Sequence, residues 1–337
     1  MRIATVRAIM LFMGIALVSV PARGQERRAR DARRQVPKGV RAVLDVAYVP
    51  GPDIHPLQKL DLFIPSDPLG PSHGPLPLIV YVHGGAWRGG DKRDFPAMGL
   101  TAAGYAVAAV NYRLSADAKF PAQVQDCKAA VVWLRKNAKA YGIDPDRIGA
   151  WGDSAGGHLV ALLGTAGDVK EWEPAEEKVS SRVQCVVDWF GPSDLAKMNA
   201  QAAEQAKQPD GTQPAPPRRR LDHDAADSPE SELIGGPVQE NKDKAAKASP
   251  VTYASADDPP FLIMHGDQDP LVPVAQSREL AEALKADGVD VTFEVIKGAG
   301  HGGPAFLADD AMRRVAAFFD EHLKPAKAVP KAAPAGG

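Results

Sequence analysis

A continuous apolar run at residues 76–82, followed by a regular alternation of strand-like and helix-like segments, constrains this 337-residue chain more than any other feature. A strand without polar residues is expected to be buried on both faces, as the strands of a parallel sheet are. Strands that alternate with helices are joined by crossover connections, which cover both faces of the sheet with helices. The sequence therefore predicts an α/β fold with a mostly parallel central sheet.

The expected elements follow from runs of apolar residues with a period of two or of 3.6 residues. Strands are expected at 43–49, 59–64, 76–82, 105–110, 147–151, 183–190, 261–265 and 291–296, and helices at 121–141, 155–165, 274–287 and 305–323. The first two strands precede the regular alternation, so they are the ones expected to pair antiparallel if any do.

The first 24 residues predict a removable signal peptide. Arg2 and Arg7 form a basic start, residues 8–20 are apolar, and Ala22-Arg23-Gly24 supplies small residues for cleavage. The apolar run is shorter than the roughly 20 residues that a transmembrane helix needs. We therefore expect a secreted or periplasmic protein with no membrane attachment after cleavage; an uncleaved anchor is the alternative.

The rest of the chain divides into a leader, one domain and a tail. Residues 25–39 are Arg-rich and predict a flexible leader, and residues 325–337 predict a disordered tail. The domain at 40–324 contains a polar insertion, 196–258, which is either a lid or partly disordered. Within the insertion we expect disorder over about 199–227 and short helices at 229–236 and 241–248.

Charge and cysteine content exclude several classes of function. The net charge of -2 gives no basis for binding nucleic acid. Cys127 falls on an apolar stripe with helical spacing, so we expect a buried thiol rather than a disulfide with Cys185. The sequence has no metal-ligand spacing and no dinucleotide fingerprint, so no metal or cofactor is expected.

The segment Gly152-Asp153-Ser154-Ala155-Gly156 lies between an expected strand and an expected helix. A nucleophilic serine must stand clear of its backbone, and a tight strand-to-helix turn with small neighbours provides this. The helix N-terminus then directs amides at developing negative charge. Ser154 is therefore the candidate nucleophile, and the N–H of Ala155 is one candidate oxyanion donor.

A second glycine-containing loop, His83-Gly84-Gly85-Ala86-Trp87, follows the strand at 76–82. Glycines at such a position let backbone N–H groups approach a substrate oxygen, as an oxyanion hole requires. The second donor is Gly84, Gly85 or Ala86, and the sequence does not distinguish them. Trp87, the last residue of this segment, is expected to contact the substrate.

The candidate base follows from chain order, because the Gly-x-Ser-x-Gly motif around Ser154 is typically followed along the chain by the acid and then by the histidine. His301 lies in a glycine-rich loop after the last expected strand, whereas His158 is expected to pack locally beside the nucleophile. His265 ends a strand, His223 lies in the insertion and His322 in the terminal helix. His301 is therefore the candidate base.

Three aspartates follow strand ends and are candidates for the acid that orients His301. These are Asp194, Asp267 and Asp269. Pro270 restricts the backbone directly after Asp269 and helps to hold its side chain in place. Asp267 can equally bond the backbone of its own turn.

With these motifs, the chain resembles carboxylesterase-like α/β hydrolases grouped with bacterial feruloyl esterases. The similar stretches are HGGAWRGGDK at 83–92, GDSAGGH at 152–158, FGPSD at 190–194, SPVTY at 249–253, PPFLIMHGDQDPLVP at 259–273 and GAGHG at 298–302. The resemblance implies the α/β-hydrolase fold and a triad of Ser154, Asp269 and His301, with Asp269 preferred because it fits the acid motif. Ala86 departs from the hormone-sensitive-lipase-like pattern, which has a third glycine there.

The resemblance and the motifs together predict an exported serine esterase that forms an acyl-enzyme. Its expected substrates are small-molecule or carbohydrate esters, such as acetyl or feruloyl esters; the oligomeric state is not predicted. An amide hydrolase, either a small peptidase or arylformamidase-like, is the alternative. A third hypothesis is a non-catalytic binding protein on a hydrolase scaffold.

Overall fold

The computed structural model describes residues 36–52, 54–66, 74–93, 95–174, 178–207 and 221–324. The predicted signal peptide, the leader up to residue 35 and the predicted tail lie outside these residues. Every helix and strand described belongs to the unit that begins at Lys38.

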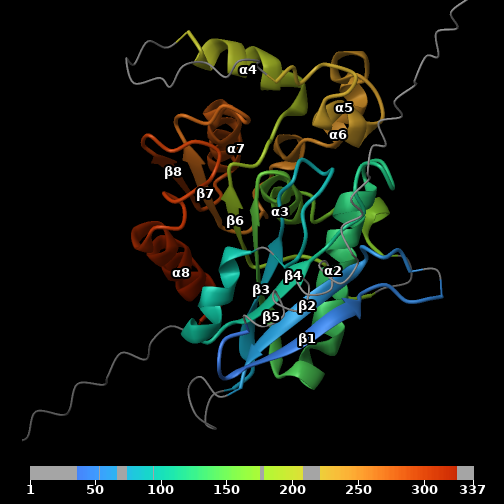
Figure 1. The fold of residues 1–337 in the computed structure, drawn as a ribbon, viewed down its shortest axis with the longest axis vertical. Coiled ribbons are helices and arrows are strands. Elements are labelled where there is room, and N and C mark those ends of the chain that lie inside the picture. Colours follow the sequence, from blue (N-terminus) through green and yellow to red (C-terminus); the bar gives the residue numbers. More distant parts are fainter. Residues whose placement is uncertain are drawn as a thin grey trace, which may run out of the picture. The chain divides into compact units, whose positions relative to one another are not determined.

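Within the described residues, eight strands form one sheet in the order β1-β2-β4-β3-β5-β6-β7-β8 (Figure 1). The strands are β1 (Val40–Ala47), β2 (Lys59–Pro65), β3 (Leu76–Val82), β4 (Ala106–Val110), β5 (Ile143–Asp153), β6 (Cys185–Trp189), β7 (Phe261–Gly266) and β8 (Val291–Ile296). β2 pairs antiparallel with both β1 and β4, and every other pairing is parallel. The predicted, mostly parallel sheet is confirmed.

Helices follow the strands along the chain. The α-helices are α2 (Ala122–Tyr141), α3 (Ala155–Thr165), α4 (Met198–Gln205), α5 (Pro229–Ile234), α6 (Lys242–Lys247), α7 (Val274–Ala286) and α8 (Asp309–Leu323). Short 3₁₀ helices are η2 (Pro96–Ala103), η3 (Lys170–Trp172), η4 (Leu195–Lys197), η5 (Val238–Glu240) and η6 (Pro250–Tyr253). Helix α8 begins later than the predicted residue 305, because the residues before it form turns.

The two faces of the sheet carry separate hydrophobic clusters because successive side chains of a strand point to opposite faces. Leu78, Val80 and Val82 of β3 lie in the cluster that includes α2, α3 and α7. Ile79 and Tyr81 lie in the cluster that includes η2 and α8. All five of these side chains are at most 2% exposed, as predicted for a strand buried on both faces.

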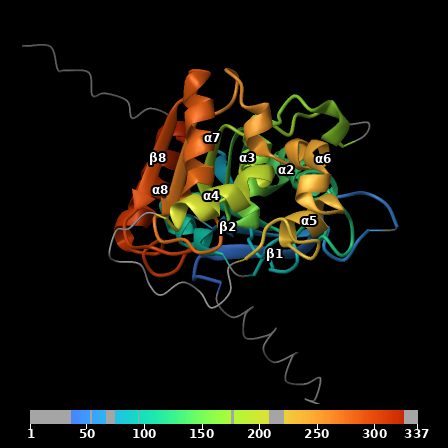
Figure 2. The same cartoon turned by 90° about the horizontal axis from the view of Figure 1, so that it is seen from above.

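The insertion is more ordered than the sequence analysis predicts. Helix α4 occupies part of the segment 199–227 that was expected to be disordered, while α5 and α6 match the expected short helices. Figure 2 shows α4 beside α7. The fully buried side chains of Leu233, Val238 and Ala245 belong to the hydrophobic cluster that includes α2, α3 and α7. Residues 208–220 lie outside the described residues.

The two cysteines lie on opposite faces of the sheet. Cys127 and Cys185 are both buried and unbonded, in different hydrophobic clusters. The prediction of a buried, free Cys127 is confirmed. Of the helices in the described part of the chain, none combines the length and the apolar character required to cross a bilayer.

Leu233→Ala tests whether the insertion is part of the folded core. Leu233 is fully buried, so its truncation should lower the free energy of unfolding by about 2–5 kcal/mol. Leu221→Ala is the matched control in the same insertion, since Leu221 is 40% exposed and its truncation should change stability by about 0.5 kcal/mol or less. Urea unfolding of both variants measures the difference, and equal midpoints would contradict the packing of α5.

Candidate active site

Ser154 occupies the turn between β5 and α3 with a backbone that few non-glycine residues adopt. Its φ is 53° and its ψ is -121°. A Cβ at Gly156 would lie 2.0 Å from the carbonyl oxygen of Val82, and one at Gly152 would lie 2.3 Å from that of Gly156. Glycine is therefore required at position 156 for the turn to pass so close to the end of β3, and at position 152 for the turn itself to be this tight.

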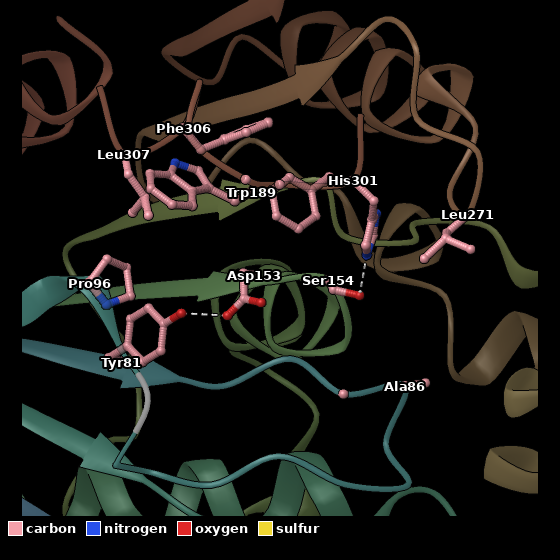
Figure 3. Close-up of a pocket in the computed structure, with 14 residues that line it drawn as sticks. Tyr81, Ala86, Pro96, Asp153, Ser154, Trp189, Leu271, His301, Phe306 and Leu307 are labelled. Atoms are coloured by element: carbon pink, nitrogen blue, oxygen red, sulfur yellow. Dashed lines mark hydrogen bonds between the residues drawn. The ribbon is translucent and has the colours of Figure 1, made fainter. Parts of the chain in front are cut away.

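Two loops bring a histidine and an aspartate to Ser154; Figure 3 shows the contact of the histidine, His301, with the serine. His301 follows β8, and its Nε2 lies 2.8 Å from Ser154 Oγ. Its Nδ1 lies 2.6 Å from Oδ2 of Asp269, which follows β7. An Nδ1–H donated to the carboxylate leaves Nε2 free to accept the proton of the serine hydroxyl. This arrangement can activate Ser154 for attack on an electrophilic carbon.

Asp269 is held in place by backbone and side-chain donors. Its carboxyl is buried, and Oδ1 accepts hydrogen bonds from the N–H groups of Leu271 and Val272 at 2.8 and 2.9 Å. Burial alone raises the pKa of Asp269, but the hydrogen bonds with His265 and His301 outweigh it and bring the pKa well below its usual range. The carboxylate therefore stays charged and can stabilise a protonated His301.

His265 supports the acid rather than the serine. Its Nε2 lies 3.2 Å from Asp269 Oδ2 and 2.9 Å from the carbonyl oxygen of Val272. Its Nδ1 lies 2.7 Å from the hydroxyl of Ser277, so both ring nitrogens have partners. The ring is fully buried. His265 thus links β7 and α7 to the carboxylate that orients His301.

The other two candidate acids have different partners. Asp267 Oδ1 accepts a hydrogen bond from the N–H of Gly298 at 2.6 Å. Asp194 accepts one from the N–H of Ala196 at 3.1 Å, and it pairs with Lys197 at 3.0 Å. Both therefore stabilise local backbone, and the structure brings Asp269 to His301.

Gln205 of α4 is a supporting residue that sequence reasoning missed. Its amide Nε2 donates to the carbonyl oxygen of Asp269, and its Oε1 accepts from the N–H of Val274, both at 2.9 Å. The insertion thus braces the loop that carries the acid. No sequence signal marks Gln205, because it lies in a stretch rich in alanine and glutamine.

The loop after β3 lies next to Ser154, and its three candidate donors differ. The N–H of Gly84 donates to Oδ1 of Asp153 at 3.1 Å. Gly85 and Ala86 line the pocket, with φ values of 115° and 54°. Ala155 begins α3 directly after the nucleophile. Gly84 is therefore already engaged, whereas Gly85 and Ala86 face the space beside Ser154.

Trp87 departs from its predicted role in substrate binding. It is 2% exposed, its indole N–H donates to Nδ1 of His158 at 3.2 Å, and the pocket lining does not include it. The left-handed backbone at Ala86 and Trp87 accompanies this inward turn of the indole. His158 packs locally as predicted, and burial lowers its pKa to about 4.

The pocket at Ser154 has a volume of about 430 Å³ and is mostly apolar. Trp189, Phe306 and Leu307 line one side, and His301 lies at the same end as Ser154 (Figure 3). Phe190, whose ring packs against His301 and Phe306, also lines the pocket. Tyr81, Asp153 and Pro96 line the other end. Sequence reasoning assigned no role to Tyr81, Pro96 or the apolar residues of the first side, because the elements that carry them are far apart in the chain.

Comparison with protein families gives two matches. The chain matches the BD-FAE family over residues 60–284 and the dienelactone hydrolase family over residues 245–329. The first match contains the loop after β3, Ser154 and Asp269, and the second contains Asp269 and His301.

Individual relatives include esterases. Esterase LipQ of Mycobacterium tuberculosis is 31% identical over 67% of this chain and 50% of its own length. The probable carboxylic ester hydrolase LipM of the same organism is 34% identical over 63% of this chain and 46% of its own length. The chain thus spans about half the length of these curated relatives. The structure of a truncated carbohydrate esterase from gut microbiota is 31% identical, with a TM-score of 0.72, over 85% of this chain and 97% of that one.

Substitution of the three aspartates tests which acid serves His301. Asp269→Asn should lower kcat with 4-nitrophenyl acetate by about 10⁴, as when an amide replaces the carboxylate of a Ser-His-Asp triad. Asp267→Asn and Asp194→Asn are the matched controls and should lose far less. Steady-state rates of folded variants measure the ranking, and a larger loss in either control would reassign the acid.

Proposed function

The chain belongs to the BD-FAE family and has the α/β-hydrolase fold, and from this premise we propose that it is an exported serine carboxylic ester hydrolase. The observation that carries the proposal is the continuous contact from Ser154 Oγ to His301 Nε2, and from His301 Nδ1 to Asp269, at 2.8 and 2.6 Å. These distances match those of a nucleophile, a base and an orienting acid.

The proposed reaction proceeds through an acyl-enzyme. Ser154 Oγ attacks the ester carbonyl carbon while His301 Nε2 takes the hydroxyl proton. The tetrahedral intermediate then loses the alcohol, which receives this proton from His301. Water, deprotonated by the same histidine, attacks the acyl-serine; the carboxylic acid is released as His301 returns this proton to Ser154 Oγ. Asp269 stays ionised and stabilises the protonated imidazole through both halves.

Backbone N–H groups stabilise the negative oxygen in this mechanism. We assign one donor to Ala155 at the start of α3, where the helix dipole also favours negative charge. The second is Gly85 or Ala86, both of which line the pocket. Gly84 is omitted because its N–H already donates to Asp153.

Esters of carbohydrates, such as acetyl or feruloyl esters, are the proposed substrate class. One similar structure is named as a carbohydrate esterase. Another is named as a bifunctional GH43-CE protein of Bacteroides eggerthii; it is 32% identical with a TM-score of 0.69, over 83% of this chain and 38% of that one. The open pocket, with apolar residues on one side and Asp153 and Tyr81 at one end, suits a substrate with both apolar and hydroxylated parts.

Export is proposed from the first 24 residues, with their basic start and short apolar run. N-terminal sequencing of protein recovered outside the cytoplasm tests it. Cleavage after Gly24 would leave Gln25 first, whereas an intact Met1 on extracytoplasmic protein would contradict a removable signal.

Ser154→Ala tests the proposed activity. Removal of the nucleophile should lower kcat by about 10⁶ and abolish labelling by a fluorophosphonate, while the unfolding midpoint stays close to that of the wild type. The substrate panel is 4-nitrophenyl acetate, acetylated and feruloylated sugars, amino-acid anilides and formylkynurenine. Faster turnover of the last two would favour the amide-hydrolase alternative. Near-normal ester turnover by folded Ser154→Ala would end the proposal.

A further inference from the structure

We propose that Asp153, positioned by Tyr81, forms a subsite that accepts a hydrogen bond from a hydroxyl group of the substrate and repels a carboxylate. This inference deepens the proposed function and rests on it, because the subsite lies in the same pocket as Ser154. It adds a preference for neutral, hydroxylated esters.

One oxygen of Asp153 is occupied within the protein and the other is not. Oδ1 accepts hydrogen bonds from the hydroxyl of Tyr81 and from the N–H of Gly84. In the described part of the chain, no group donates to Oδ2. Asp153 lines the pocket, where Figure 3 shows its carboxyl between Tyr81 and Ser154. Oδ2 packs against Gly84, where an added Cβ would lie 2.5 Å from it, but it accepts no described hydrogen bond and is therefore available to a donor on a bound ligand.

The charge on this carboxylate has no ion-pair partner in the described part of the chain. Among the described ion pairs, none joins Asp153 to a lysine, arginine or histidine. Burial and the negative charge of Asp153 raise the pKa of Tyr81 well above its usual value, so the phenol keeps its proton and donates it. An ionised carboxylate only accepts hydrogen bonds, and in a partly buried site it repels another negative charge.

The turn that carries Ser154 does not itself require a carboxylate at position 153. The close approaches in the turn involve Gly152 and Gly156, and an asparagine oxygen would accept from Tyr81 and Gly84 equally well. What aspartate adds is a second acceptor with a negative charge. The second acceptor and its charge can affect substrate binding only if Oδ2 is accessible from the pocket.

The ligand is identified by its chemistry as a hydroxyl donor on a neutral ester. A substrate that extends from Ser154 towards Asp153 passes beneath Phe306 and Leu307, which suits the apolar face of a ring (Figure 3). The hydroxyl has two sources, the phenol of a hydroxycinnamoyl group or a hydroxyl of a sugar. Both present the same donor to Oδ2.

Selectivity, not rate alone, tests the subsite. One arm uses the methyl esters of cinnamate, 4-hydroxycinnamate and 4-carboxycinnamate. The other uses O-acetyl methyl glucoside and O-acetyl methyl glucuronide. The measured quantity is kcat/KM of the hydroxylated ester divided by kcat/KM of the carboxylate ester. In one of the two arms, Asp153→Asn should reduce this ratio from its wild-type value by about tenfold or more, the usual effect of a charged hydrogen bond. The arm that responds identifies the source of the hydroxyl.

Two variants separate the subsite from other roles of Asp153. Asp267→Asn makes the same change in net charge outside the pocket and should leave the ratio unchanged. Tyr81→Phe keeps the carboxylate, so it should still discriminate against the carboxylate substrates. An equal fall of kcat/KM on all substrates in Asp153→Asn would mean that Asp153 only braces Gly84, and would overturn the proposal. An unchanged ratio, or the same change in Asp267→Asn, would also overturn it.

Binding separates this proposal from the proposed activity. Calorimetry of the same esters with Ser154→Ala protein needs no turnover, and it should show tighter binding of the hydroxylated member than of the carboxylate. Adding Asp153→Asn should remove this preference. If the wild type hydrolyses none of the esters yet the preference is present, the proposed function fails and the subsite stands. If esters are hydrolysed and neither binding nor rate shows the preference, the subsite fails alone.

Discussion

The close contact between the turn at Ser154 and the end of β3 is the constraint on which the site depends. The turn passes so near to Val82 that only glycine fits at position 156. This contact holds Ser154 in its left-handed backbone and aims α3 at the pocket. It also places the loop after β3 beside the nucleophile. A parallel sheet brings these parts together because the carboxyl ends of β3 and β5 meet at the same edge.

The acid and base depend on a second set of supports, on the other side of the nucleophile. Backbone N–H groups and His265 surround the carboxylate of Asp269, and Gln205 ties its loop to α7. Helix α4 is itself held by Gln201, which bonds Glu279 and Gln276 of α7. The insertion is therefore coupled to the geometry of His301, although none of its described residues lines the pocket or bonds the nucleophile.

The features that the sequence predicted correctly depend on local pattern. The apolar period indicated the strands and long helices, and glycines around Ser154 indicated the turn. The choice of Asp269 required the resemblance to a family, because three aspartates follow strand ends. Helix α4 was missed because it buries only Met198 and is stabilised by hydrogen bonds to α7, 69 or more residues away. Trp87 was misjudged because the direction of its side chain depends on a left-handed backbone at Ala86 and Trp87 themselves, and a sequence pattern indicates such backbone only at glycines.

Asp153 connects the support of the oxyanion loop with the proposed recognition of the substrate, because its two carboxylate oxygens have different roles. Through Oδ1 it joins Tyr81 of β3 and the N–H of Gly84, so it stabilises the loop that supplies the oxyanion donors. In the proposed subsite, Oδ2 presents negative charge to the pocket that Asp153 lines. Movement of the carboxylate towards a ligand would therefore strain its bond to Gly84. A neutral donor that binds Oδ2 where it stands requires no such movement, so the arrangement favours substrates whose hydroxyl reaches the carboxylate while the ester carbonyl lies at Ser154.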